Sequence, residues 1–158
     1  MLNNTRELTE FILSKLKYKL PQINWQLYPN IQDLKGLQLP IGNLALQQFD
    51  FTPRVTTDLK TVDCTFSIRL LFNDTSLAQL NIRDAALAVA SYLHRNYLSE
   101  QIELIEVISS NQDYFTPEIN GFVAWEILFI TRFYCGDSIY QLNGISPDVE
   151  LNINNNLV

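Results

Sequence analysis

Residues capable of nucleophilic or general-base chemistry are few in this sequence, and they are scattered. His94 is the only histidine, and no acidic residue accompanies it at helical spacing. Serines occur without the G-x-S-x-G pattern, and the five glycines form no phosphate-binding loop. A serine–histidine–aspartate triad and a nucleotide-hydrolysing site therefore both lack their usual residues.

Two carboxylate pairs could perform acid–base or glycosidic chemistry, Glu103 with Glu106 and Asp113 with Glu118. Each pair falls on a strand edge or in a polar loop, where solvated charge is the ordinary explanation. Cys64 and Cys135 match no metal-ligand spacing, and we interpret them as buried free thiols. We therefore expect a protein that is not an enzyme and has no catalytic residue, cofactor or metal.

The composition indicates one soluble domain with an unusually uncharged surface. Of 158 residues, 47% are hydrophobic and 18% are charged, compared with roughly a quarter charged in an average soluble domain. The net charge of -6 disfavours general attraction to nucleic-acid phosphates or anionic membranes. No apolar run approaches the ~20 residues that span a bilayer, so we expect no membrane association. Because the two distant cysteines do not suggest a disulfide framework, we also expect a reducing compartment.

The first half of the chain predicts one helix and three strands. Asn4 and Glu7 have capping-box spacing, and the apolar residues that follow recur every three or four positions until Pro21. Alternating apolar residues predict strands over 23–27, 43–51 and 61–72. The third is the clearest, because Val62 to Phe72 alternate with polar neighbours, as in a sheet with one wet face.

The second half predicts one helix and two strands, separated by polar turns. Apolar residues at helical spacing favour a helix over 82–97, and strands are expected over 102–108 and 121–135. The fold class is therefore α+β, in the order α-β-β-β-α-β-β. We expect a mixed, mainly antiparallel sheet of about five strands with both helices on one face. Residues 1–135 form this domain, and 136–158 form a polar, asparagine-rich extension.

The last strand is apolar on both of its faces. Two helices cover only one side of a five-stranded sheet, so the other side requires a neighbouring subunit or the tail. From this we predict a subunit interface on the outward face of the strand, made by Leu128, Ile130, Arg132 and Tyr134. A polar hairpin tip over 52–60 is a second contact candidate, because such tips often carry binding residues.

The chain resembles the small tail terminator proteins of tailed phages, especially those with contractile tails. The resemblance covers roughly residues 5–135. It is carried by five segments of this sequence: LPQINWQLYP after the opening helix, the GNLALQQFDF and TFSIRLLF strands, the AALAVASYL helix and the closing GFVAWEILFITRF strand.

The resemblance implies a virion protein at the neck end of the tail, assembled in the host cytoplasm. Six copies would form a ring on the last ring of tail tube protein, stop tube growth and meet the head-neck connector or stopper protein. In a contractile tail the ring also meets the sheath protein. DNA would pass through the lumen without specific binding. For docking to tube or sheath we predict Pro53, Arg54, Asp58 and Lys60, and for the acidic lumen Asp58, Asp63 and Glu126.

Two other interpretations stay open at this point. Other phage neck or tail-completion proteins also have small α+β folds. A different class is a monomeric enzyme or small-molecule-binding domain, with its site under the loop at 113–121. That class predicts a ligand-sized pocket and no ring.

Overall fold

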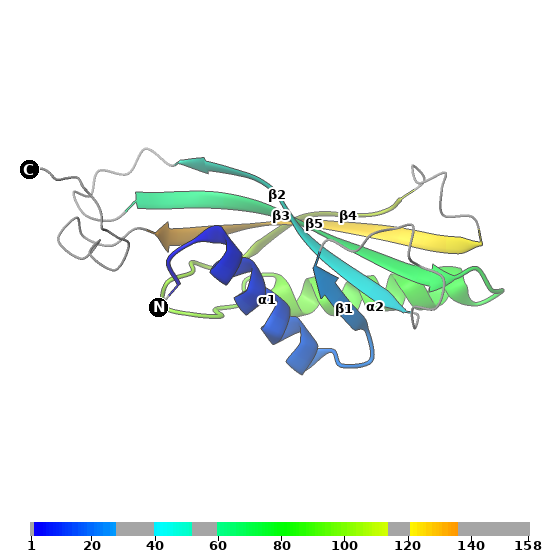
Figure 1. Cartoon of the computed structure of the whole chain (residues 1–158). Helices are drawn as coiled ribbons and strands as arrows, with labels where there is room; N and C mark the ends of the chain where they lie inside the picture. The colour runs from blue at the N-terminus through cyan, green and yellow to red at the C-terminus, as the bar shows by residue number, and fades with distance from the viewer. Residues whose placement is uncertain (1, 28–39, 52–59, 114–120, 136–158) are drawn as a thin grey trace, which may run out of the picture.

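The computed structural model describes residues 2–27, 40–51, 60–113 and 121–135 and confirms the predicted α+β class and element order. Five strands form one sheet, and both helices lie on the same side of it (Figure 1). In chain order the elements are α1 (Thr5–Lys19), β1 (Asn24–Leu27), β2 (Ile41–Phe51), β3 (Lys60–Asn73), α2 (Ala78–Leu93), β4 (Glu106–Gln112) and β5 (Phe122–Cys135).

Helix α1 begins where the capping pattern predicts. The side-chain oxygen of Asn4 accepts a hydrogen bond from the Glu7 backbone N–H at 2.9 Å. The Glu7 carboxylate reaches one residue further back than in a regular capping box, because it accepts from the Asn3 N–H at 2.7 Å. The helix ends at Lys19, and the Leu20 N–H still donates to the Leu16 carbonyl before Pro21 follows.

Helix α2 lies four residues earlier than the predicted range of 82–97. It starts at Ala78, which is buried, and ends at Leu93. The prediction was wrong at the C-terminal end because Arg95 adopts a positive φ of 60°. Its N–H donates to the Ile105 carbonyl at 2.7 Å, and this tertiary contact turns the chain away from the helix.

The sheet has the order β1-β2-β3-β5-β4, in which only β1 and β2 run parallel. Strand β4 begins at Glu106, so the predicted strand 102–108 is correct only in its second part. Upstream of it, Ile102 makes isolated bridges to Ser99 and Phe133. Ile102 and Ile105 are nevertheless fully buried, which explains why the apolar pattern extended to them.

The core lies between the sheet and the two helices. Phe66 on β3 and Phe129 on β5 are cross-strand neighbours, and their rings stack with centroids 5.3 Å apart. Cys64 is buried on the same face and is not part of a disulfide, as predicted, and the side chain of Cys135 lies outside the described residues. Aromatic stacking at the centre of two long strands fixes their register, and hence which side chains meet on the opposite face.

Candidate functional site

The sheet face opposite the helices, here called the open face, carries most of the residues that the sequence singled out. The four predicted interface residues, Leu128, Ile130, Arg132 and Tyr134, alternate along β5 on this face, and all four are half-buried. The predicted lumen residues Asp63 and Glu126 lie on the same face, where Asp63 pairs with Arg132 across the strands. One surface therefore contains two sets of residues to which the sequence assigned different roles.

At one end of the open face, Arg132 holds two carboxylates. Its Nε and Nη2 donate to the two carboxylate oxygens of Asp63, at 2.7 and 3.1 Å. The Glu103 carboxylate lies 3.8 Å from Nη1 and also accepts a hydrogen bond from the Tyr134 hydroxyl. The hydrogen bond to Asp63 raises the pKa of the Arg132 guanidinium. We call these four residues the Arg132 cluster.

Further along the strands, Arg69 organises a second group, the Arg69 cluster. Its Nε lies 2.9 Å from a carboxylate oxygen of Asp113, whose side chain is only 8% exposed. Its Nη2 lies 3.9 Å from Glu126, which also accepts a hydrogen bond from the Ser67 hydroxyl at 3.1 Å. Asp113 enters this cluster from beyond the end of β4, so β3, β5 and the segment after β4 are joined here.

Leu128 and Ile130 separate the two clusters. Along β5 the open-face order is Glu126, Leu128, Ile130, Arg132, and the small polar neighbours on β3 are Ser67 and Thr65. Each cluster contains one arginine and two carboxylates, so each keeps a net charge of -1. An apolar strip bordered by ordered polar and charged side chains is typical of a protein contact surface, with a desolvated centre and a polar rim.

Part of the open face is already buried within the chain. Ile41, Leu71 and Ala124 form one row across β2, β3 and β5, and they are 0%, 0% and 5% exposed. They do not belong to the core cluster between sheet and helices. The apolar surface available to a partner is therefore narrower than the sequence pattern predicted, and it centres on Leu128 and Ile130.

The predicted docking tip falls mostly outside the described residues. This applies to Pro53, Arg54 and Asp58, and of Lys60 only the backbone position at the start of β3 is described. The role of these residues in docking stays a prediction.

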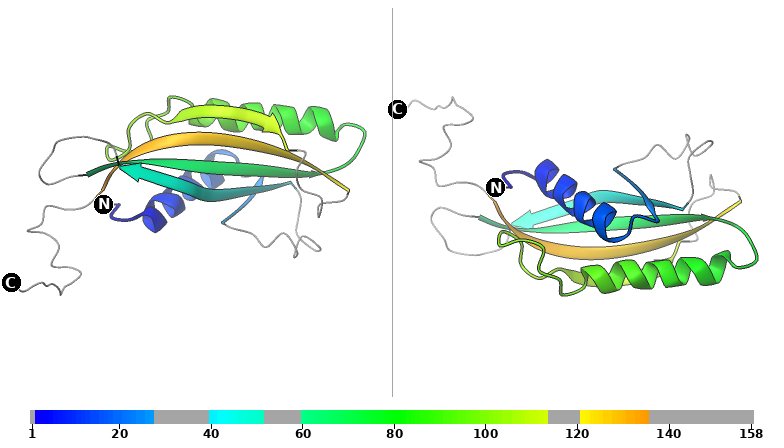
Figure 2. Two further views of the ribbon diagram at one scale, coloured as in Figure 1. Left: turned by 90° about the horizontal axis from the view of Figure 1, so that it is seen from above. Right: turned by 90° about the horizontal axis from the view of Figure 1, so that it is seen from below.

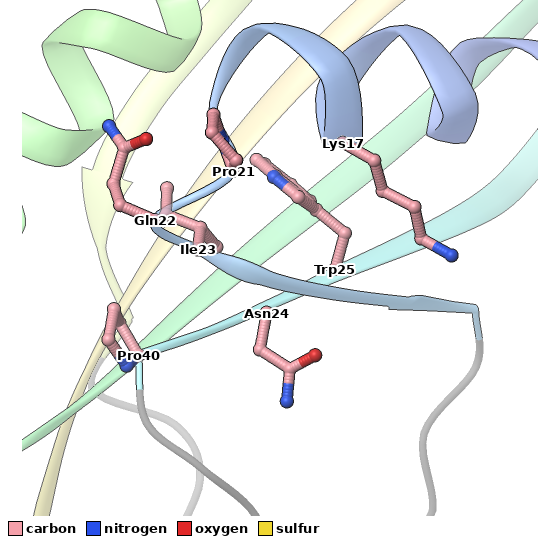
Figure 3. A pocket seen from close by; sticks show the side chains of 7 residues that line it. All are labelled: Lys17, Pro21, Gln22, Ile23, Asn24, Trp25 and Pro40. Atoms are coloured by element: carbon pink, nitrogen blue, oxygen red, sulfur yellow. The ribbon is translucent and has the colours of Figure 1, made fainter.

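The described part of the chain has two pockets. The larger, of about 550 Å³, lies where α1 ends and β1 begins (Figure 3), and Lys17 is the one titratable side chain among its described lining residues. The second, of about 350 Å³, lies beside the first turns of α1, and its lining includes the oppositely charged Arg6 and Glu10. Residues 114–120 are not described, so the proposed site under that loop is untested.

The histidine of the chain makes a backbone contact between the end of α2 and β4. His94 follows α2, and its Nδ1 accepts a hydrogen bond from the Val107 N–H at 3.1 Å. No group of histidine, cysteine, aspartate or glutamate in the described part of the chain is arranged to bind a metal ion.

Comparison with known proteins does not assign the chain to a family. No protein-family model matches it, and no curated protein matches it. Among the described helices, none is both long and apolar enough to cross a bilayer.

Sequence reasoning did not assign four members to the two clusters: Ser67, Arg69, Glu103 and Asp113. Glu103 and Asp113 were considered only as partners of Glu106 and Glu118. Alternation places Ser67 on the wet face of β3, but nothing local indicates its partner. Glu103 and Asp113 lie outside regular strands and reach the open face through long-range contacts. The pairing of β3 with β5 brings the strand residues together, and backbone hydrogen bonds from Glu103 to Arg132 and from Asp113 to Ala124 add the other two.

Proposed function

We propose that this chain is a structural virion protein, a tail terminator that caps the end of a phage tail tube as a homo-hexameric ring. The ring ends tube growth, meets the head-neck connector or stopper protein, and meets the sheath where the tail is contractile. The single observation that supports this best is the Leu128–Ile130 strip. It is an apolar surface on the sheet face that the two helices leave uncovered, in a small domain with a net charge of -6.

A ring-forming role also suits the way this strip is bordered. The Arg132 and Arg69 clusters hold their side chains in defined positions on either side of it. Side chains that are already ordered lose little conformational entropy on association. The two clusters therefore favour a specific contact over nonspecific association. We assign Leu128, Ile130, Arg132 and Tyr134 to the contact between subunits.

The charge of the chain suits a passage for DNA. A net charge of -6 per copy disfavours adhesion of the phosphate backbone to the ring. Asp58, Asp63 and Glu126 are the proposed lumen residues. Asp63 and Glu126 lie beside Arg132 and Arg69, so their contribution to the lumen potential is partly cancelled.

The first test is the assembly state of the purified chain. Native mass spectrometry should give six copies, and negative-stain images should show a six-fold ring. A monomer throughout the accessible concentration range would contradict the proposal and would favour the ligand-binding alternative. A ring that leaves polymerisation of the tube protein from the same genome unaffected would favour another neck or tail-completion component.

The second test concerns docking of the ring to tube or sheath. Reversing the charge of Arg54 with Arg54→Glu should produce tails of abnormal length while the free protein still assembles. Electron microscopy of particles from a phage carrying the substitution measures tail length, and Lys60→Glu provides a second position on the same tip. Normal tail lengths in both variants would show that the tip over 52–60 does not take part in docking.

A further inference from the structure

Helix α2 carries apolar side chains on two opposite sides. The side that faces the sheet contributes five buried residues to the core: Ala78, Ile82, Ala86, Val89 and Leu93. On the outer side, Leu77, Leu80 and Leu87 are 60%, 57% and 66% exposed. Figure 2 shows α2 along one side of the molecule, with no other described helix or strand outside it. Because the outer side of a surface helix is normally polar, these leucines indicate a second contact.

The exposed leucines have the spacing of a surface that pairs with another helix. Leu77, Leu80 and Leu87 are three and seven residues apart, which is the a/d pattern of a two-stranded coiled coil. Asp84 and Ser91 occupy the other positions of the pattern, and both are exposed. We call these five positions the α2 seam. A polar residue within such a seam specifies how two helices align, so a matching helix should offer a positive charge close to Asp84.

A second copy of α2 supplies that charge when the two helices run parallel. At about 100° per residue, Arg83 and Asp84 lie on opposite sides of the line through Leu80 and Leu87. Both are exposed, and neither makes an ion pair with another described side chain. Parallel pairing places Asp84 of each copy beside Arg83 of the other. Antiparallel pairing would instead bring arginine to arginine and aspartate to aspartate.

We propose that two copies of this chain pair through the α2 seam, with the two helices parallel and a two-fold axis between them. Leu80 and Leu87 of each copy meet the same residues of the other, and two Arg83–Asp84 pairs form across the contact. The inference goes beyond the proposed function and does not rest on it, because the seam lies on the helix side and leaves the open face uncovered. Three leucines per copy bury less area than a standard interface, so we expect weak pairing that requires a high protein concentration.

Disulfide trapping tests this pairing. Leu80→Cys and Leu87→Cys are prepared singly in a Cys135→Ser background and oxidised at high protein concentration. Because parallel helices align each position with itself, each single variant should form a disulfide-linked dimer. Asn81→Cys is the matched control, since Asn81 is exposed on the same helix but lies on one flank of the seam. A disulfide requires Cα atoms within about 7 Å, so the control should give about tenfold less dimer.

Charge reversal tests the direction of the helices independently. In the Leu87→Cys protein, either Arg83→Asp or Asp84→Arg replaces attraction with repulsion and should lower the dimer yield about fivefold. The two changes together restore opposite charges across parallel helices, so the exchanged variant should recover the original yield. Circular dichroism checks that each variant is folded. A yield that neither single reversal changes would overturn the parallel arrangement.

The trapping experiment also separates this inference from the proposed function. Dimers that form only when Leu80→Cys is mixed with Leu87→Cys would show antiparallel helices and overturn the inference. Yields no higher than that of Asn81→Cys would overturn it too, and would assign the seam to a contact with a different protein. Six-fold rings without disulfide-linked dimers would leave the proposed function standing. Disulfide-linked dimers of a protein that forms no ring would contradict the proposed function alone.

Discussion

Arg132 and Asp63 are direct cross-strand neighbours on β5 and β3, and the guanidinium donates to both oxygens of the carboxylate. This pair lies at one end of the Leu128–Ile130 strip, where it positions Arg132 between Asp63 and Glu103.

A double-mutant cycle with Arg132→Ala and Asp63→Ala should give a coupling energy of about 0.5–1 kcal/mol, because both side chains are partly exposed. Urea unfolding of the four proteins measures it. The control is the Arg6–Glu10 pair, 3.5 Å apart and 85% and 50% exposed, for which we expect about 0.3 kcal/mol. Equal coupling in the two cycles would argue against an ordered cluster on the open face.

Ile130→Asp should convert the proposed ring into monomers or aggregates, because it places a charge in the desolvated centre of the proposed contact. Sedimentation velocity measures the assembly state, and circular dichroism checks that the variant is folded. Leu77→Asp is the control, since Leu77 is 60% exposed at the N-cap of α2, a position that favours aspartate. An unchanged sedimentation profile for a folded Ile130→Asp protein would show that Ile130 is not part of a subunit interface.

Gly42→Ala should destabilise the domain by about 1–3 kcal/mol, because there is no room for the added methyl group. A Cβ at this position would lie 2.6 Å from Cε3 of Trp25, which pairs with Gly42 across β1 and β2. Chemical denaturation measures the loss. Combining Gly42→Ala with Trp25→Leu should cost less than the two single changes added together, and simple additivity would contradict the steric explanation.

Asn4→Ala should reduce stability by about 1 kcal/mol, because the Glu7 N–H loses its partner at the start of α1. Asn4→Asp keeps a side-chain acceptor and should stay close to the unchanged protein. Thermal unfolding followed by circular dichroism compares them. A loss of equal size in both variants would show that the cap hydrogen bond is not what stabilises this end of the helix.

Local patterns were sufficient to predict the elements whose ends are determined locally. Asn4 and Pro21 bracket α1 through backbone hydrogen bonding within a few residues, so its position was predictable. The end of α2 depends on the hydrogen bond from Arg95 to Ile105, ten residues away, and no helical pattern indicates it. The early start predicted for β4 has a similar cause, because Ile102 and Ile105 are buried without belonging to the strand.

The sequence by itself determined the α+β class, the element order and the faces of the long strands, because alternation and helical spacing follow directly from backbone geometry. The alternating pattern could place Asp63 and Arg132 on the side of their strands that faces away from the core. Only the tertiary structure decided that these two residues face each other and that Arg69 lies between Asp113 and Glu126. Register is a long-range property, set by how the apolar face packs against the helices, and it determines which charges compensate one another on the opposite face.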